Sequence, residues 1–537
     1  MPWPLAHSLL LVALCMAGIA LRMSCAGRPY WIDEAWVLNS VLSPSLGAMF
    51  NYREWLQTTP PGLLLLLRAV AMVVPQWLDH LRWLFILCGI ATLLLFMRTA
   101  KTMLGRSFLC LACAVFALSP ALVWNATEVK QYSVDALATT ANLYCGLAYI
   151  AQPSRTLYTR WCVLNVLFVT VSFSVVLCLP AMVLAGLVMH DAPRWPARLR
   201  AVLPHTLLAA CAVGFIYLVF VRPHAGLPSL AQFWAQGFHA TSGESVLFYW
   251  RRNLSLLFYF LDIKIASPGG LLLLLALTGI GAVSVLRAAD GVRRGAARLM
   301  VLAMPIVATV IANQLGVYPL GEYRMVAFLA PCLIVLMARG LEWGVGMALA
   351  PCRGAIGRHA GHAGHALGLA STLAMVVFLA NTLSVQWWGP SRGGGERLWR
   401  GSVEILPLID YLHAVDALRR PVFVHAFYQQ LFRYYTRETP LQAPVSFAHS
   451  GYPCCIPDKP WHGYGADPAE VAQEVAALVE LNGKTPFHVV LYARPSWPSR
   501  DAVAPYIAAF DAHGCKAAWR LDSMRVALLR IECAPGG

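Results

Sequence analysis

Charged side chains are scarce in this sequence. Only 12% of its 537 residues are Asp, Glu, Lys or Arg, whereas 58% are hydrophobic. Soluble domains carry about 25% charged residues. Several apolar runs approach the length of about 20 residues that a helix needs to cross a bilayer. The composition therefore excludes a water-soluble fold and predicts an α-helical polytopic membrane protein in contact with the lipid bilayer.

Acidic residues are particularly few. The chain has 26 acidic residues against 41 basic ones, which gives a formal net charge of +15. Such an excess can indicate nucleic-acid binding. Here, however, the arginines cluster in short segments between apolar runs, as they do in the cytoplasmic loops of membrane proteins. We therefore exclude nucleic acid as a partner.

Basic residues are also absent before the first apolar segment, residues 5–23. A cleaved signal peptide normally has a positive charge there, so an uncleaved signal anchor is favoured. The alternative of a removed signal peptide stays open, because Ser24-Cys25-Ala26 resembles a cleavage site. Both interpretations place Asp33 on the far side of the membrane. The bias toward Ala, Arg, Gly and Trp indicates a bacterial protein of the cell inner membrane.

The basic segments set the membrane topology. The segments 98–106, 155–160, 194–200, 287–298 and 353–365 are rich in Arg and His and belong in the cytoplasm by the positive-inside rule. The chain changes sides of the membrane at each span and must be in the cytoplasm at each of these segments, which predicts about eleven spans. They are residues 5–23, 80–98, 107–123, 133–151, two helices within 161–190 that meet near Ser174, 201–221, 267–286, 299–317, 325–341 and 366–386. The N-terminus lies in the cytoplasm and the chain after residue 388 lies outside.

The run 61–75 is an exception, because it contains Arg68 and is short for a span. We interpret it as an interfacial helix, with residues 36–46 as a second helix on the membrane surface. The predicted transmembrane module is thus residues 1–391, with a first exterior loop at residues 24–79.

The tail, residues 392–537, has the pattern of a small α/β domain. Strands are expected at residues 421–425, 487–492 and 524–531, and helices at 404–418 and 468–481. Its cysteines can form one or two disulfides if the domain is extracytoplasmic. These cysteines are Cys454, Cys455, Cys515 and Cys533.

The exterior loops carry ionisable residues that the positive-inside bias does not explain. Adjacent carboxylates beside hydrocarbon are costly unless they face water, a metal or a partner. A helix beginning near Thr127 would put Glu128, Tyr132 and Asp135 on one face. The alternative is that these charges only form ion pairs at the membrane rim. The candidates are Arg28, Asp33 and Glu34 in the first loop, Glu128, Lys130, Tyr132 and Asp135 in the second, and Glu322, Tyr323 and Arg324 in a later one.

Acids and bases at one exterior face suit the transfer of a sugar from a polyprenyl-phosphate donor. The acceptor hydroxyl needs a general base, and the departing phosphate needs positive charge. Asp33, with Glu34 as a second candidate catalytic residue, could supply the base, and Lys130 and Arg324 could stabilise the phosphate. A divalent cation that bridges phosphate and carboxylate is an alternative that the sequence leaves open.

The order of several motifs resembles the bacterial branch of the GT-C glycosyltransferases, related to the protein mannosyltransferase and lipid A aminoarabinose transferase families. The motifs are Asp33-Glu34, Thr59-Pro60-Pro61-Gly62, Leu81-Arg82-Trp83, Ser119-Pro120 and the segment 128–135. The resemblance covers about residues 1–345. It implies Asp33 as catalytic base, a polyprenyl-phosphate sugar donor and an extracytoplasmic acceptor. Many relatives have His where this chain has Thr59, so any role of that histidine is absent.

Two other functions fit less well. A transporter or flippase of lipid-linked anions would concentrate polar residues near the bilayer midplane and often has internal repeats, which we do not find. A polymerase or ligase of lipid-linked glycans usually has a large late exterior loop, whereas the longest one here, residues 222–267, is moderate. His224, His239 and Glu244 in that loop are interpreted as ordinary surface residues rather than metal ligands.

Overall fold

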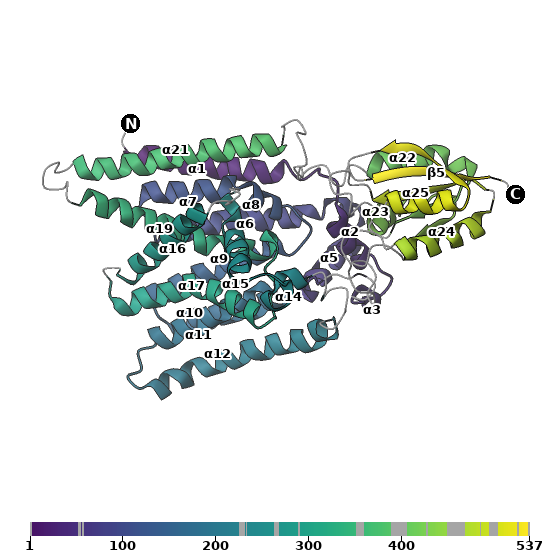
Figure 1. Cartoon of the computed structure of the whole chain (residues 1–537). Coiled ribbons are helices and arrows are strands. Elements are labelled where there is room, and N and C mark those ends of the chain that lie inside the picture. The colour runs from purple at the N-terminus through teal and green to yellow at the C-terminus, as the bar shows by residue number, and fades with distance from the viewer. Residues whose placement is uncertain are drawn as a thin grey trace. The chain divides into compact units, whose positions relative to one another are not determined.

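The computed structural model describes residues 3–51, 55, 58–224, 231, 234–261, 268–287, 290–350, 359–387, 405–425, 428–447, 468–483, 485–492, 503–522 and 526–534. The chain forms two compact units (Figure 1). The helical unit comprises Met1–Gly27, Thr59–Val221 and Trp234–Trp388. The α/β unit comprises Arg28–Thr58, Arg222–Phe233 and Gly389–Gly537. The predicted boundary at residues 391 and 392 lies outside the described residues.

The helical unit is built from long apolar helices joined by short turns. Its elements are α1 (Trp3–Met23), α5 (Pro61–Val73), η1 (Pro75–His80), α6 (Arg82–Ala100), α7 (Arg106–Leu118), α8 (Pro120–Asn125), α9 (Tyr132–Ala151), α10 (Arg155–Val171), η2 (Ser174–Cys178), α11 (Leu179–Met189), α12 (Trp195–Ile216), η3 (Tyr217–Val221), η5 (Ala235–Gly237), α14 (His239–Ser242), α15 (Val246–Leu257), η6 (Tyr259–Leu261), α16 (Pro268–Leu286), α17 (Val292–Gln314), α18 (Tyr323–Val326), η7 (Ala327–Leu329), α19 (Ala330–Leu349) and α21 (His359–Trp387).

Within the described residues, seven helices are long and apolar enough to cross a membrane. They are Leu5–Met23, Leu78–Ala100, Trp195–Val221, Pro268–Leu286, Val292–Gln314, Tyr323–Leu349 and Ala363–Thr382. The chain is therefore a multi-pass membrane protein, as its composition predicts. The other predicted spans coincide with α7, α9, α10 and α11, which are shorter or less apolar. The count of about eleven spans stays a prediction.

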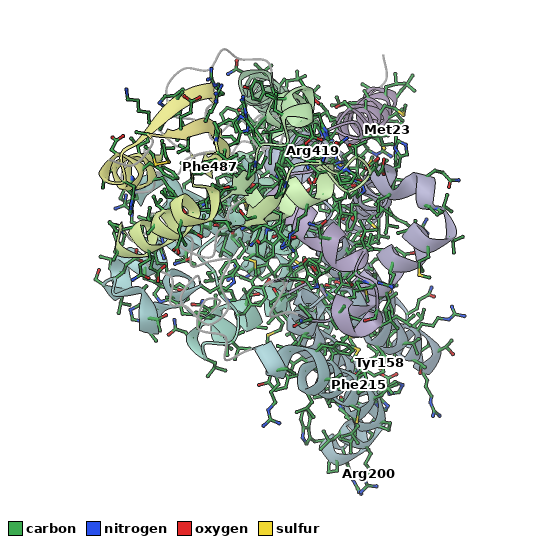
Figure 2. The ribbon with its side chains drawn as sticks, turned by 90° about the vertical axis from the view of Figure 1, so that its right-hand side faces the viewer. Met23, Tyr158, Arg200, Phe215, Arg419 and Phe487 are labelled. Atoms are coloured by element: carbon green, nitrogen blue, oxygen red, sulfur yellow. A yellow bond between two sulfur atoms is a disulfide. The ribbon has the colours of Figure 1, made fainter. Side chains whose placement is uncertain are left out.

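The predicted pair of short helices within residues 161–190 is confirmed, with the first beginning earlier, at Arg155. α10 and α11 are joined by the single turn η2. Tyr158 of α10, which is labelled in Figure 2, belongs to this pair. Its ring packs edge-on against His205 of α12, with ring centroids 4.9 Å apart. A Cβ at Gly186 of α11 would lie 2.7 Å from the Tyr158 ring, so only glycine permits this approach of the two helices.

Arg22, buried at the end of α1, supplies hydrogen bonds that are missing where the chain turns between α7 and α8. The ring nitrogen of Pro120 carries no hydrogen, so it cannot donate to the carbonyl of Phe116, its partner in a continuous helix. The Arg22 guanidinium donates to the carbonyls of Phe116 and Ala117 instead, at 3.3 and 3.1 Å. In lipid an unpaired carbonyl would be costly. Arg22 thus stabilises the turn that leads into the second exterior segment.

The predicted first exterior loop contains the expected helices with different limits. α2 (Ile32–Val41) begins four residues before the predicted start and α3 (Leu46–Met49) follows it as a separate turn. The earlier start is explained by Glu34, whose carboxylate accepts a hydrogen bond from the Trp31 N–H at 3.0 Å and so caps the helix.

The α/β unit contains a five-stranded sheet in the order β2-β1-β3-β5-β4. β2, β1 and β3 are parallel, with Val422 opposite both Val445 and His488, and β5 runs antiparallel to β3 and β4. The elements are α22 (Ile405–Val415), η8 (Asp416–Leu418), β1 (Val422–Val424), α23 (Gln429–Tyr435), β2 (Val445–Phe447), α24 (Pro468–Asn482), β3 (Phe487–Tyr492), α25 (Val503–Ala512), β4 (Cys515–Asp522) and β5 (Val526–Cys533).

The expected small α/β domain is thus confirmed, although the sequence did not predict β2 or β4. Burial of the central strands explains why β1, β3 and β5 could be predicted, since Val424, Val489 and Leu528 are fully buried. Cys515 and Cys533 face each other across β4 and β5 and form a disulfide. Cys454 and Cys455 lie outside the described residues.

Candidate active site

The two adjacent carboxylates of the first loop have different surroundings. The Glu34 side chain is fully buried, and its Oε1 lies 3.5 Å from the equally buried Arg28 guanidinium. Its Oε2 accepts the hydrogen bond from the Trp31 N–H. Asp33 is half-buried. Glu34 is therefore engaged in holding the loop together, whereas Asp33 has an accessible surface.

The helix that carries Asp33 is fastened to the C-terminal part of the α/β unit. The Asn39 side-chain amide of α2 donates to the carbonyl and the side-chain oxygen of Gln430 on α23, at 2.8 and 2.7 Å. The Tyr435 hydroxyl donates to the Tyr30 carbonyl at 2.9 Å. These hydrogen bonds involve one residue before Asp33 and one after it, and they fix its helix against α23.

The second exterior segment, in the helical unit, is a turn rather than the start of a helix. α8 ends at Asn125 and α9 begins only at Tyr132. The Trp124 indole N–H donates to Glu128, and the Arg82 guanidinium donates to the Thr127 carbonyl. These two bonds hold residues 126–131 in the turn. The expectation that Glu128 shares a helical face with Tyr132 and Asp135 is therefore wrong.

Tyr132 and Asp135 do share the first turn of α9, and both are buried. The Ser172 hydroxyl donates to Asp135, and Ser174 lies 3.1 Å from Ser172. Lys130, just before the helix, is half-buried. The acid and the lysine thus lie in different surroundings although only five residues separate them.

Tyr318 connects the second exterior segment to the third. Burial, followed by the negative charge of Asp135, raises the pKa of Tyr318 well above its ordinary value. Its hydroxyl donates to the Met325 carbonyl at 2.8 Å. The start of α9 and residues 318–325 are therefore neighbours within the helical unit.

A buried amide network supports the third segment. The Asn313 side chain, at the end of α17, donates to the carbonyls of Gly237 and Tyr318 at 2.7 and 3.0 Å. The Leu320 N–H also donates to Gly237, at 2.9 Å, and the Gly321 N–H donates to Asn253 at 3.0 Å. Gly321 has a φ of 47°, which favours glycine. The network holds the loop from two sides.

The ionisable residues at the end of this loop are ordered by their neighbours. Arg324 Nε lies 3.1 Å from Glu322, and the Arg324 side chain is 15% exposed. The Tyr323 ring stacks on Tyr259, with centroids 4.2 Å apart. Glu322 therefore compensates part of the Arg324 charge, and Tyr323 fixes the backbone beside it.

The predicted residues thus fall into two groups. Arg28, Asp33 and Glu34 belong to the α/β unit, and the structure brings them together. Those of the second and third segments belong to the helical unit, where Tyr132 and Asp135 lie at the start of α9 and Arg324 lies in α18. The convergence of Lys130 and Arg324 with Asp33 stays a prediction.

No three His, Cys, Asp or Glu side chains gather closely enough to hold a metal ion in the part of the chain that the structure describes. In the loop with the remaining histidines, Glu244 pairs with Arg252 at 2.6 Å, and the His239 ring packs against Tyr249. The side chain of His224 lies outside the described residues.

Several residues of the site were not in the predicted set. They are the supporting residues Arg82, Trp124, Ser172, Gly237 and Asn313. Arg82 had a signal, because an arginine in the first turn of an otherwise apolar span is costly without a partner. The others are uncharged, and nothing in the sequence distinguishes them from packing residues.

The sequence matches no protein-family model and no curated protein. Among solved structures it is similar to ArnT from Cupriavidus metallidurans bound to undecaprenyl phosphate, with a TM-score of 0.54, 13% identity and 97% of each chain covered. The apo form of that protein gives a TM-score of 0.54 at 13% identity over 98% of each chain. An oligosaccharyltransferase of Archaeoglobus fulgidus gives a TM-score of only 0.47 at 12% identity, over 90% of this chain and 69% of that one. The fold expected from the GT-C resemblance is confirmed.

Proposed function

We propose that this chain, which has the fold of a GT-C membrane enzyme, is an integral membrane glycosyltransferase. It transfers a hexose or pentose from a polyprenyl-phosphate donor to an extracytoplasmic acceptor, which is a glycolipid, an envelope glycan or a protein. The observation that carries this proposal is the contrast between the accessible Asp33 and the buried Glu34 beside it. The similarity in fold to a protein bound to undecaprenyl phosphate supports the donor class.

In the proposed reaction Asp33 takes the proton of the acceptor hydroxyl as its oxygen attacks the anomeric carbon of the sugar. The bond from that carbon to the phosphate oxygen breaks, and polyprenyl phosphate leaves with the bonding electrons. Lys130 and Arg324 bind the phosphate of the donor and stabilise the further negative charge that develops on it. A divalent cation on the phosphate remains the alternative source of positive charge.

Glu34 and Arg28 have a different role in this proposal from the one expected from sequence. Their buried ion pair and the bond to the Trp31 N–H hold the first turn of α2, which contains Asp33. We therefore assign them as positioning residues for Asp33 rather than as groups that contact the substrate.

Replacing Lys130 or Arg324 by Gln should raise the KM for the lipid donor by about 10- to 100-fold, because each removes a charged hydrogen bond to phosphate. A transfer assay with a purified polyprenyl-phosphate sugar measures the effect. Arg160→Gln, which removes one exposed charge from a predicted cytoplasmic segment, is the matched control. An unchanged KM in both site variants would contradict the assignment of the phosphate site.

We also propose that the α/β unit lies outside the cytoplasm. Residues 28–58 and the C-terminal sheet belong to one compact unit, so they share one side of the membrane. The disulfide between Cys515 and Cys533 fits an oxidising compartment.

Alkylation with a maleimide polymer before and after reduction tests this location. Reduction of the wild-type protein isolated from cells should increase the number of alkylated thiols, because it frees the two cysteines of the disulfide. In the double variant Cys515→Ser/Cys533→Ser this increase should be smaller by two thiols. Equal gains in the two proteins would mean that the disulfide does not form in the cell, and the tail would then be assigned to the cytoplasm.

A further inference from the structure

An open groove of about 710 Å³ lies wholly within the helical unit, between α6 and the neighbouring helices. Leu11 of α1, Leu109 of α7 and Leu137 of α9 contribute to its walls. Ala91, Leu94, Leu95 and Arg98 of α6 also line it, and their spacing of three and four residues puts them on one helical face. The groove is apolar except at the end where α6 finishes.

Two cations stand at that end. Arg98 lies in the last turn of α6 and Lys101 follows the helix, and both side chains are exposed. The Arg98 guanidinium lies over the Tyr144 ring, 5.6 Å from its centroid, and Arg98 also lines the groove. The positive-inside rule places this end of α6 in the cytoplasm.

These cations differ from two other basic residues of the predicted cytoplasmic segments, whose charges are compensated by acids. Arg293 pairs with Asp191 at 3.2 Å, and Arg298 pairs with Asp290. Within the described ranges, neither Arg98 nor Lys101 has a carboxylate within ion-pair distance. Their positive charge is therefore left for a ligand, and that ligand must also offer an apolar surface to the groove.

We propose that the groove binds an anionic diacyl phospholipid of the cytoplasmic leaflet. The phosphate lies between Arg98 and Lys101, and one acyl chain follows the α6 stripe. From Arg98 to Ala91 the stripe runs about 10 Å along the helix, which fits within the roughly 15 Å of one leaflet's hydrocarbon. Basic pockets on the cytoplasmic side of membrane helices favour acidic headgroups, whereas the ammonium of a zwitterionic lipid is repelled by the same two cations.

The groove is separate from the proposed sugar-transfer site. Arg82, which supports the turn at residues 126–131, begins α6, and Arg98 lies about 24 Å further along the same helix. The lipid site therefore stands whether or not the proposed reaction is correct. A polyprenyl phosphate has the same phosphate chemistry, so the experiment must distinguish the two lipids.

Native mass spectrometry of the full-length protein, exchanged into equal amounts of phosphatidylglycerol and phosphatidylcholine, tests the proposal. The wild type should retain phosphatidylglycerol about tenfold over phosphatidylcholine. Arg98→Gln/Lys101→Gln should abolish this preference. The control Arg155→Gln/Arg160→Gln removes two exposed charges from another predicted cytoplasmic segment and should keep it. Leu94→Trp, which fills the groove and leaves both charges, should also reduce retention.

Three outcomes would overturn the proposal. They are retention by Arg98→Gln/Lys101→Gln equal to the wild type, equal loss in the control variant, and displacement of phosphatidylglycerol by an equimolar amount of polyprenyl phosphate. The last would assign the groove to the carrier lipid. Melting temperatures within a few degrees of the wild type show that the variants are folded.

Discussion

Replacement of Asp33 by Asn is expected to lower the rate of sugar transfer by about 10²- to 10⁴-fold, the usual cost of losing a general base. The amide has nearly the same shape as the carboxylate but cannot accept the proton of the acceptor hydroxyl. Because Asp33 is half-buried and the substitution keeps the buried pair of Arg28 and Glu34, the melting temperature should change little. A single-turnover assay with the purified full-length protein measures the chemical step.

A matched control is available in the same predicted exterior loop. Asp79 is exposed in η1, and Asp79→Asn makes the identical chemical change at a position without a proposed role. It should keep activity within about threefold of wild type, well below the cost of losing a general base. If Asp33→Asn is also that active, Asp33 is not the base, and the proposed mechanism fails even if the protein transfers sugar.

Glu34→Gln should have the opposite profile, a large loss of stability. Glutamine can still accept the hydrogen bond from the Trp31 N–H, since its side-chain oxygen serves at this capping position as that of Glu does. What it removes is the negative charge that compensates Arg28 in a fully buried pair. Breaking such a pair by removing one partner costs about 3–5 kcal/mol, because the other charge stays buried.

For a domain of this size, that loss corresponds to a fall in melting temperature of about 6–20 °C. Differential scanning calorimetry of the purified protein measures it. The double variant Arg28→Met/Glu34→Leu, which replaces both charges by apolar groups, should recover most of the stability. A Glu34→Gln protein that melts with the wild type but does not transfer sugar would show that Glu34 acts in the chemistry, as the sequence alone suggests.

The membrane helices could be predicted from sequence because their main requirement is composition. A run of apolar residues long enough to cross the bilayer must form its hydrogen bonds internally and becomes a helix. The membrane side of each loop could also be predicted, because the bias of positive charge toward the cytoplasm is a property of the sequence alone. The helix limits at α2 and α9 could not be predicted, since the side chains of Glu34, Trp124 and Arg82 set them through contacts.

The edge strands of the sheet and the side chains that support the candidate site could not be predicted from the sequence either. β2 has only three residues and β4 alternates poorly, and both lie at edges of the sheet, where pairing rather than burial stabilises them. Asp33 and Glu34 have the same charge and adjacent positions, so only the fold distinguishes the buried acid from the accessible one. The sequence assigns the candidate site residues to one side of the membrane, but the side alone does not reveal that they belong to two compact units.

The attachment of α2 to α23 has a consequence for the biogenesis of the protein. Asn39 and its partner Gln430 are 391 residues apart in sequence. At about 5–20 residues per second, a ribosome needs roughly 20–80 s to make the chain between them. The segment with Asp33 is among the first parts of the protein to be synthesised, yet it meets its docking helix only when synthesis is almost finished. We therefore expect the proposed activity to be acquired only at the end of translation, because a prematurely terminated chain lacks the helix that holds α2.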